Sequence, residues 1–519
     1  MLPLAGVAQV TTSQYDNART GANLKETKLT PRNVNVRQFG KLFSFHVDGD
    51  VYAQPLFLNN VVFIATEHDS VYAFDAAGKS LSPLWKTSFI DPQKGISTVP
   101  AENVNCPFIS PEVGITSTPV IDASTRTIYV LARTKERDSS GSARFWQRLH
   151  ALDVLTGAEK LGGQVVIQAS VSSPKGGFFG LFPAPIDFLA LHENPRASLL
   201  LSDGKIYLTW ASSCDVGPYH GWIIAYDAHT LKQLGAFNTS PDSLESGIWQ
   251  SDTGPTADED GNVFVATGNG RFDALGGGRD YGDSVLKVGF TRAGLAVKDY
   301  FTPFNQEELN ATDGDLGSGG PLLIPQQPGS KARLLVVGGK GAVIYVIDRD
   351  RMGRFREGSD RHAVETIKVG GAIMSAPAYW NGHIYYFPSD DVLKDFAIQN
   401  GRLSAQPVAK GSTNFDDPGA TPSISANGAK DGIVWVIETK GWNSNDRAAV
   451  LRAYDAENVA NEIYDSNQNI QRDGADIARR FTIPTVADGR VYVGTSGEVD
   501  VYGLLPVRRA SSRSPRAAQ

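Results

Sequence analysis

A unit of three short apolar segments is repeated along almost the whole chain, and it restricts the fold more than any other feature. Seven of the eight units open with a small residue, a proline and an apolar residue, whereas the third lacks a clear proline. In every unit, two apolar strands separated by turns follow. The second strands of the eight units read VVFIAT, TIYVLA, KIYLTW, NVFVAT, RLLVVG, HIYYFP, GIVWVI and RVYVGT. Self-similarity of this kind is the signature of a repeat architecture.

The chemistry of the repeat favours a β-propeller. Short runs of β-branched and aromatic residues predict half-buried strands, and the absence of helical periodicity between them excludes a βαβ barrel or solenoid. Proline in the opening strand indicates an edge that lacks a hydrogen-bonding partner, as the innermost strand of a propeller blade does. We therefore expect an all-β, eight-bladed β-propeller over residues 11–505. A pair of β-sandwiches explains neither the proline register nor the count.

The two ends of the chain carry further expectations. The last unit ends at Leu505 without a fourth strand, and "KLFSFHV" at 41–47 is placed to supply it, so an N-terminal strand is predicted to close the ring. Residues 1–10 are either a remnant of a secretion signal or a flexible N-terminus. Because "LPLAGVA" resembles the end of an apolar signal region before a small-residue cleavage site, we expect an exported protein, secreted or periplasmic. The basic tail at 506–519 is predicted to be disordered.

The charge of the chain limits its possible binding partners, and its cysteines form no recognised motif. The net charge of −7 and the pI near 5.7 argue against a nucleic-acid partner, and no apolar run is long enough to span a membrane. Cys106 and Cys214 form no CxxC or CxxCH motif, and the sequence leaves open whether they pair with each other.

Most catalytic motifs are missing. The chain has no GxSxG, HExxH, P-loop or GxGxxG motif. "TEHDSVYAFD" groups Glu67, His68 and Asp69, which we interpret as a solvated hairpin rather than a site. "DGDLGS" opens like an EF-hand loop, but Ile324 stands where that loop requires a glutamate, so this reading fails.

Polar residues depart from the repeat in three consecutive units. Asp215, Asn269 and Lys340 each follow the second strand of a unit, and Asp315 precedes the opening strand of the fifth. Loops after equivalent strands emerge on one face of a propeller, so these four side chains are expected to converge near the channel mouth. The two carboxylates and the amide oxygen of Asn269 suit Ca²⁺, and a carboxylate beside a lysine can act as a general base. The alternative is that each of these residues only stabilises a glycine-rich turn. For the neighbouring Asp313, the turn role is our interpretation.

The repeat region resembles the PQQ-type quinoprotein dehydrogenases, which are eight-bladed propellers that oxidise alcohols or sugars. It is especially similar to bacterial PQQ-like β-propeller proteins that share "YDNARTGAN", "VYAQPL", "ATEHDSVYAFD" and "PEVGITSTPVID". The resemblance extends from about residue 12 to residue 505. It implies the propeller fold, with PQQ and Ca²⁺ as cofactors.

The resemblance also implies roles for single residues. "SSCDVG", "ATGNG" and "DLGSGGPLL" resemble the segments that carry the calcium ligands, which assigns Asp215, Asn269 and Asp315 to the metal. Asp315 would be the catalytic base and Lys340 would contact the quinone. The PQQ-binding set would also include Trp249, as the floor beneath PQQ, and Cys106, which stands where the alcohol dehydrogenases have two adjacent cysteines. Asp215 departs from the family, which has the longer glutamate there.

Two hypotheses follow for the function. The first is a PQQ- and Ca²⁺-dependent dehydrogenase that oxidises an alcohol or sugar and, lacking a CxxCH haem motif, passes electrons to a separate acceptor. The second is a cofactor-free β-propeller that acts as an exported binding or scaffold protein. A non-redox enzyme that uses the channel mouth as its pocket is a third reading.

Overall fold

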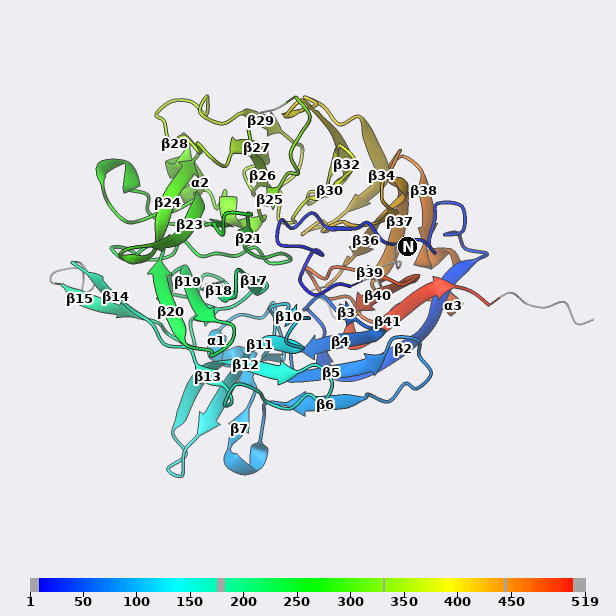
Figure 1. Cartoon of the computed structure of the whole chain (residues 1–519), viewed down its shortest axis with the longest axis horizontal. Coiled ribbons are helices and arrows are strands. Elements are labelled where there is room, and N and C mark those ends of the chain that lie inside the picture. Colours follow the sequence, from blue (N-terminus) through cyan, green and yellow to red (C-terminus); the bar gives the residue numbers. More distant parts are fainter. Residues whose placement is uncertain (1–8, 175–182, 330–331, 443–445, 507–519) are drawn as a thin grey trace, which may run out of the picture.

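The computed structural model describes residues 9–174, 183–329, 332–442 and 446–506. In this part of the chain, eight sheets of four or five strands surround a common centre (Figure 1), and two further sheets have two strands each. The expected all-β, eight-bladed propeller is confirmed. Residues 1–8 and the tail after residue 506, for which we expected a signal remnant and disorder, lie outside the described residues.

The first four blades follow the chain from the innermost strand outward. Their strands are β3 (Leu56–Leu58), β4 (Val61–Thr66), β5 (Ser70–Asp75) and β6 (Trp85–Ser88); β10 (Val120–Asp122), β11 (Thr127–Arg137), β12 (Ala143–Asp153) and β13 (Val165–Val166); β17 (Leu200–Ser202), β18 (Lys205–Ser212), β19 (Trp222–Asp227) and β20 (Gln233–Asn238); and β21 (Thr256–Ala257), β22 (Val263–Ala266), β23 (Val285–Thr291) and β24 (Gly294–Thr302).

The remaining four blades keep the same order. Their strands are β25 (Leu322–Leu323), β26 (Leu334–Gly338), β27 (Val343–Asp348) and β29 (Glu365–Lys368); β30 (Ala378–Trp380), β31 (His383–Tyr386), β32 (Asp391–Gln399), β33 (Arg402–Leu403) and β34 (Ala409–Phe415); β35 (Ser423–Asn427), β36 (Lys430–Glu438), β37 (Val450–Asp455) and β38 (Glu462–Asp465); and β39 (Thr485–Ala487), β40 (Arg490–Gly494) and β41 (Ser496–Leu504).

Short strands, helices and 3₁₀ turns lie outside the blade strands, mostly in the connections between blades. They are β1 (Ala22–Asn23), β7 (Ile96–Ser97), β8 (Val99–Pro100), β9 (Glu112–Val113), β14 (Ser170–Ser173), β15 (Ala184–Asp187), β16 (Glu193–Asn194), β28 (Arg354–Phe355), the helices α1 (Ala101–Val104), α2 (Gln306–Ala311) and α3 (Ile470–Asp473), and the 3₁₀ turns η1 (Pro92–Lys94), η3 (Ala274–Gly276), η4 (Leu316–Ser318) and η5 (Ser466–Asn469). Among the described residues, no helix has both the length and the apolar content needed to cross a membrane.

The eighth blade combines strands from both ends of the chain. Strand β2 (Phe39–Asp50) pairs antiparallel with β41, with Phe39 opposite Leu504, and forms the outer strand of that sheet. Strand β41 thereby has a partner on each side, β40 and β2, and this pairing ties the N-terminal part of the propeller to its C-terminal part.

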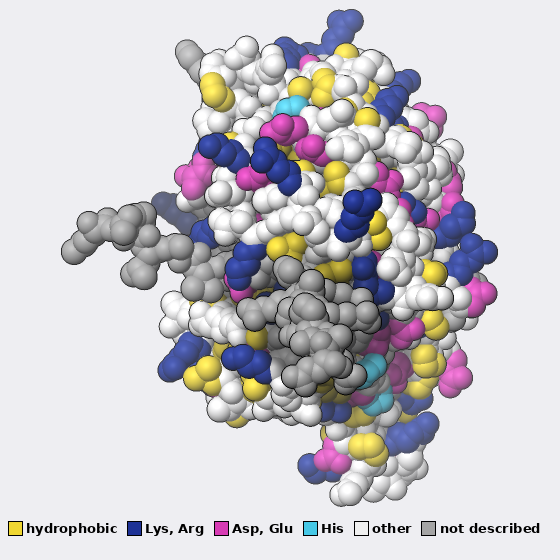
Figure 2. Space-filling model, turned by 90° about the vertical axis from the view of Figure 1, so that its right-hand side faces the viewer, with side chains coloured by type: hydrophobic (Ala, Val, Ile, Leu, Met, Phe, Trp, Pro, Cys, Tyr) yellow, Lys and Arg dark blue, Asp and Glu magenta, His cyan; other side chains and the backbone are white. Residues whose placement is uncertain are grey.

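The core lies between neighbouring blades, and alternate residues of one strand face opposite neighbours. On β18, Ile206 and Leu208 pack in the cluster shared with the second blade. Tyr207, between them, packs in the cluster shared with the fourth. This period of two is the pattern that the sequence carries. On the face of the molecule shown in Figure 2, basic and acidic side chains are interspersed, as is typical of a solvent-exposed surface.

The N-terminal segment (residues 10–23) crosses the centre of the ring and bonds to the innermost strand of every blade (Figure 1). The contacts are Val10 with Phe57, Ile121 N to Thr11 O, Asn17 Nδ2 to Leu201 O, Ala257 N to Asn17 O, Leu323 N to Ala18 O, Tyr379 N to Thr20 O, Ile424 N to Gly21 O and Val486 N to Tyr15 Oη. The segment thereby supplies hydrogen-bond partners to inner edges that would otherwise be left without them.

Arg19 anchors this segment from within. Its side chain is 0% exposed. The guanidinium donates to Thr12 Oγ1 at 2.6 Å, Ser13 O at 2.7 Å, Pro255 O at 3.1 Å and Leu199 O at 3.2 Å. One side chain thus joins the N-terminal segment to the third and fourth blades.

Candidate functional site

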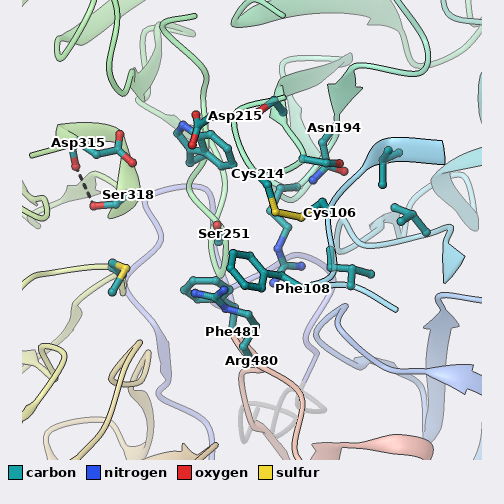
Figure 3. A pocket seen from close by; sticks show the side chains of 18 of the residues that line it. Cys106, Phe108, Asn194, Cys214, Asp215, Ser251, Asp315, Ser318, Arg480 and Phe481 are labelled. Carbon is teal, nitrogen blue, oxygen red and sulfur yellow. Dashed lines mark hydrogen bonds between the residues drawn. A yellow bond between two sulfur atoms is a disulfide. The ribbon is translucent and has the colours of Figure 1, made fainter. Parts of the chain in front are cut away.

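A pocket lies at the channel mouth, where loops from six blades meet (Figure 3). Its lining comes from the loops that follow α1, β18 and β26, the loops that precede β17, β21, β30 and β39, and the turn η4. The lining residues used below are Cys106, Phe108, Arg196, Cys214, Asp215, Trp249, Asp315, Lys340, Arg480 and Phe481. Five of the six residues singled out from the sequence, all except Asn269, line this one pocket.

Asp315 stands at the start of η4, and close backbone packing holds it there. Its side chain is buried, and a Cβ at Gly268 would collide with its Oδ1. A Cβ at Gly317 would collide with the backbone of Thr267 and Gly268 in the neighbouring blade. The glycines of "ATGNG" and "DLGSGG" therefore allow the two loops to touch, which brings Asp315 beside the loop after β22.

The Asp315 carboxylate has one satisfied and one unsatisfied oxygen. Oδ2 lies 3.3 Å from Lys340 Nζ, whereas Oδ1 is buried without a hydrogen-bond partner among the described residues. Burial raises the pKa of Asp315 to about 6, and the charge of Lys340 opposes this rise while Asp313 and Asp215 add to it. Burial disfavours the charge on Lys340, yet the neighbouring carboxylates raise its pKa overall. The pair forms a carboxylate and an ammonium group at one end of the pocket.

Asn269 lies behind this pair rather than in the lining. Its Nδ2 donates to Asp313 Oδ1 at 2.7 Å, and its Oδ1 accepts from Asp315 N at 3.3 Å. Asp313 also accepts from Lys340 at 2.8 Å. The residue that we interpreted as a turn aspartate has a left-handed backbone, with φ of 56°, and it also bridges Asn269 and Lys340.

Asp215 is exposed at the rim of the pocket, on a backbone with φ of 55°. Its Oδ1 accepts from Tyr219 Oη at 2.6 Å. Burial, together with the charge of Asp215, raises the pKa of Tyr219, so this hydroxyl stays protonated and remains a donor. Figure 3 shows Asp215 and Asp315 on the same side of the pocket.

Cys106 and Cys214 form a disulfide, which answers the question the sequence left open. The bond joins the loop after α1 to the loop after β18, across 108 residues of sequence. The disulfide and the aromatic ring of Trp249 both line the pocket, which gives it apolar surfaces beside the charged pair. In the described part of the chain, no three His, Cys, Asp or Glu side chains are grouped as a metal site.

The interpretation of "TEHDSVYAFD" as a solvated hairpin is wrong. Glu67 is 2% exposed and Asp69 is 0% exposed, because the loop before β10 covers the β4–β5 turn. Gly114 N donates to Glu67 Oε1 at 2.8 Å, and Arg133 N donates to Asp69 Oδ1 at 3.3 Å. Nothing in the local sequence distinguishes a covered turn from an exposed one, since the covering loop comes from another blade.

Buried Glu67 leads to a pH-dependence of stability. Burial raises its pKa to about 8, whereas an unfolded glutamate titrates near about 4.3. The folded protein therefore holds a proton that the unfolded chain has lost, and the free energy of unfolding should fall as pH rises between these values. Glu67→Gln keeps the oxygen that accepts from Gly114 and removes the titration. We expect the variant to gain stability over the natural protein by up to a few kcal/mol at pH 8.5, at about 1.4 kcal/mol per pKa unit.

Urea unfolding at pH 5 and pH 8.5 measures this difference. Glu307→Gln, which replaces an exposed glutamate on α2, serves as the matched control and should behave alike at both pH values. A Glu67→Gln stability difference that is equal at pH 5 and pH 8.5 contradicts the prediction.

Several pocket residues were missed by sequence reasoning. Arg196, Phe108, Arg480 and Phe481 stand in stretches without a motif, and they enter the pocket from different blades. The only signal available was the "RRF" triplet directly before the opening strand of the eighth unit, which interrupts an otherwise small-residue pattern.

Comparison with known proteins identifies the fold. No protein-family model and no curated protein matches the chain. Among solved structures, it is similar to the quinohemoprotein alcohol dehydrogenase from Comamonas testosteroni, with a TM-score of 0.60 and 14% identity over 96% of this chain and 80% of that one. It is also similar to a europium-containing methanol dehydrogenase, with a TM-score of 0.61 and 14% identity over 96% of this chain and 98% of that one.

A third structure agrees with these two. The quinohemoprotein alcohol dehydrogenase ADHIIG from Pseudomonas putida HK5 matches with a TM-score of 0.59 and 14% identity, over 98% of this chain and 82% of that one. Identity at this level is evidence for the architecture and not for the chemistry. The chain thus has an eight-bladed β-propeller fold that resembles the fold of the quinoprotein alcohol dehydrogenases.

Proposed function

We propose that this protein is an exported oxidoreductase that uses PQQ and Ca²⁺ to oxidise an alcohol or a sugar. The observation that carries the proposal is Asp315: a buried carboxylate with an unpartnered oxygen, paired with Lys340, in a pocket at the mouth of a quinoprotein-type propeller. Perturbed titratable groups in a concave pocket are typical of catalytic sites.

The unpartnered oxygen of Asp315 supports a calcium ion at this site. A buried carboxylate oxygen without a partner, such as Asp315 Oδ1, is costly, and an oxygen-ligated cation would remove that cost. Asp215 and the amide oxygen of Asn269 are the other hard ligands nearby. We propose that these three residues hold the ion.

The pocket also fits a planar, anionic aromatic group. Trp249 and the Cys106–Cys214 disulfide offer it apolar contacts, and the Lys340 ammonium offers a positive charge. When bound, PQQ supplies the acceptor for the hydride that leaves the alcohol carbon, and Ca²⁺ supplies Lewis acidity.

The residues of the chain itself accept the substrate hydroxyl proton and stabilise the charge on Asp315. With a pKa of about 6, Asp315 is mostly ionised at neutral pH and can accept the substrate hydroxyl proton. Lys340 Nζ stabilises the ionised form of Asp315 through Oδ2. Asp313 holds Lys340 from the solvent side, so that the ammonium stays directed at Asp315.

Two features support the proposed compartment and partner. A disulfide persists in oxidising compartments, which supports a secreted or periplasmic location. The sequence contains no CxxCH haem motif, so the proposed enzyme passes its electrons to a separate acceptor.

Reconstitution tests this function. The purified protein is incubated with PQQ and CaCl₂, its thermal unfolding is followed, and reduction of an artificial electron-acceptor dye is assayed with a panel of primary alcohols and aldoses. We expect a rise in the unfolding temperature with PQQ, and dye reduction that disappears on chelation of Ca²⁺. The absence of both a thermal shift and dye reduction would contradict the proposal.

The hydrogen bonds of Asn269 and Asp215 favour the second candidate, a cofactor-free binding propeller. Both polar atoms of the Asn269 amide already have protein partners, and Asp215 is held by Tyr219. In that case PQQ and Ca²⁺ leave the unfolding temperature unchanged, and Asp315→Ala leaves partner binding intact.

A further inference from the structure

The end of the pocket away from Asp315 carries two arginines that no role above uses. Figure 3 shows Arg480 and Phe481 well separated from Asp215 and Asp315. Arg196 belongs to the same end, because its guanidinium lies 5.3 Å from the Tyr52 ring and 5.4 Å from the Phe481 ring. We call Arg196 and Arg480 the arginine end of the pocket.

Aromatic rings hold both guanidinium groups in place. Arg480 lies 3.9 Å from the centre of the Trp442 ring, 4.4 Å from that of Phe481 and 5.4 Å from that of Phe108. Phe481 therefore contacts both arginines. Stacked guanidinium groups lose little further freedom when they bind an anion, because the rings have already oriented them.

The positive charge of this end is poorly balanced. The carboxylate of Asp417 approaches Arg480 Nη2 only to 3.8 Å, and its own side chain is 46% exposed. No carboxylate of the described residues forms an ion pair with Arg196; the charges of Glu67 and Asp252 act on it only from beyond ion-pair distance. Its side-chain hydrogen bond is a long one, 3.4 Å to Thr116 O. Like charge on the other guanidinium adds to burial in lowering the pKa of Arg480 to about 10.

Unused donors accompany the unbalanced charge. Arg196 is 5% exposed and its Nη2 is buried without a hydrogen-bond partner, as is Nε of Arg480. Burying a charged donor without a partner is costly. A bound anion would offset this cost by neutralising the charge and by accepting hydrogen bonds.

We propose that the arginine end binds the carboxylate group of a small organic ligand whose body lies on the apolar wall of the pocket. Guanidinium forks match the planar geometry of a carboxylate. The neighbouring wall is formed by Val104, Ile109, Val113, Met374 and the disulfide, which suits an aromatic or aliphatic body. The test of this carboxylate site is independent of the proposed function, because ligand binding is measured without catalytic turnover. If both hold, the site selects alcohols that also bear a carboxylate.

Calorimetric titration of the intact protein with benzoate, and with benzamide as a neutral probe of the same shape, tests the site. We expect benzoate to bind roughly 10- to 100-fold more tightly than benzamide. Arg196→Gln and Arg480→Gln should abolish this preference, and Arg480→Lys should keep part of it. Arg37→Gln is the matched control, because Arg37 is exposed and distant in sequence from Arg196 and Arg480; this variant should keep the whole preference.

A second titration separates two sources of the carboxylate. PQQ is itself a carboxylate, so each variant is titrated with PQQ, and benzoate is titrated again into PQQ-saturated protein. A carboxylate supplied by PQQ predicts weaker PQQ binding in the arginine variants and loss of benzoate binding after saturation. A carboxylate supplied by the substrate predicts unchanged PQQ binding and retained benzoate binding.

Three outcomes overturn the carboxylate site: no benzoate binding, equal affinity for benzoate and benzamide, or folded arginine variants that keep the preference. Thermal unfolding of each variant establishes that it is folded. Arginine-dependent benzoate binding without any PQQ binding rejects the proposed function and leaves the carboxylate site standing, so the two failures are distinguishable.

Discussion

Replacing Asp315 with asparagine is expected to lower kcat of the reconstituted protein by about two to four orders of magnitude, the range typical of a removed general base. The amide cannot accept the hydroxyl proton, although it keeps nearly the same shape. Folding should survive, because Asp315→Asn neutralises a buried group whose Oδ1 has no partner, and Lys340 keeps its ion pair with Asp313. Dye-reduction kinetics and thermal unfolding measure the two effects separately.

Asp313→Asn is the matched control for this experiment. It removes a carboxylate only two positions away, whose side chain is 63% exposed, and it leaves Asp315 beside Lys340. We expect a kcat loss of less than about tenfold, since surface ion pairs contribute little. Equal losses in the two variants, or full activity of Asp315→Asn, would show that Asp315 is not the base.

Replacing Arg19 with alanine is expected to lower the free energy of unfolding by roughly 3–5 kcal/mol, near the upper end for a single substitution. The change removes four hydrogen bonds to buried acceptors, including the carbonyls of Pro255 and Leu199 in neighbouring blades. Each buried acceptor left without a donor costs about 1–3 kcal/mol, and a large buried volume is emptied as well. The shift in the urea midpoint at constant slope measures the loss.

Arg19→Lys and Arg37→Ala complete this test. Lysine keeps the charge, but a single ammonium group cannot reach four acceptors spread around a guanidinium plane, so an intermediate loss is expected. Arg37 is exposed, and its replacement should change stability by less than about 0.5 kcal/mol. A free-energy loss below about 1 kcal/mol for Arg19→Ala would mean that Arg19 does not anchor the N-terminal segment to the blades.

Much of the architecture could be predicted because it is encoded locally. The alternation seen in Ile206, Tyr207 and Leu208 reflects a strand that packs against a neighbour on each face. The proline of "GGPLL" marks the inner edge next to β25. Each of these signals needs only the residues of one unit, and repetition over eight units strengthens them.

The candidate site could be predicted only in part. Asp215, Asn269, Asp315 and Lys340 depart from the repeat at comparable places, so their convergence followed from the geometry of a propeller. Whether they bind a metal or a quinone does not follow from that convergence, because the same residues also satisfy one another through Asp313 and Tyr219.

By itself, the sequence of this protein determined the propeller, the number of its blades and the acidic and basic residues at its mouth, because short-range periodicity encodes them. Only the tertiary structure decided that Glu67 is buried, that Cys106 pairs with Cys214 across 108 residues and that Arg196 meets Phe481. It also decided that residues 10–23 close the centre of the ring. The physical reason is that each of these features is a contact between blades, and burial and charge balance arise only when distant parts of the chain come together.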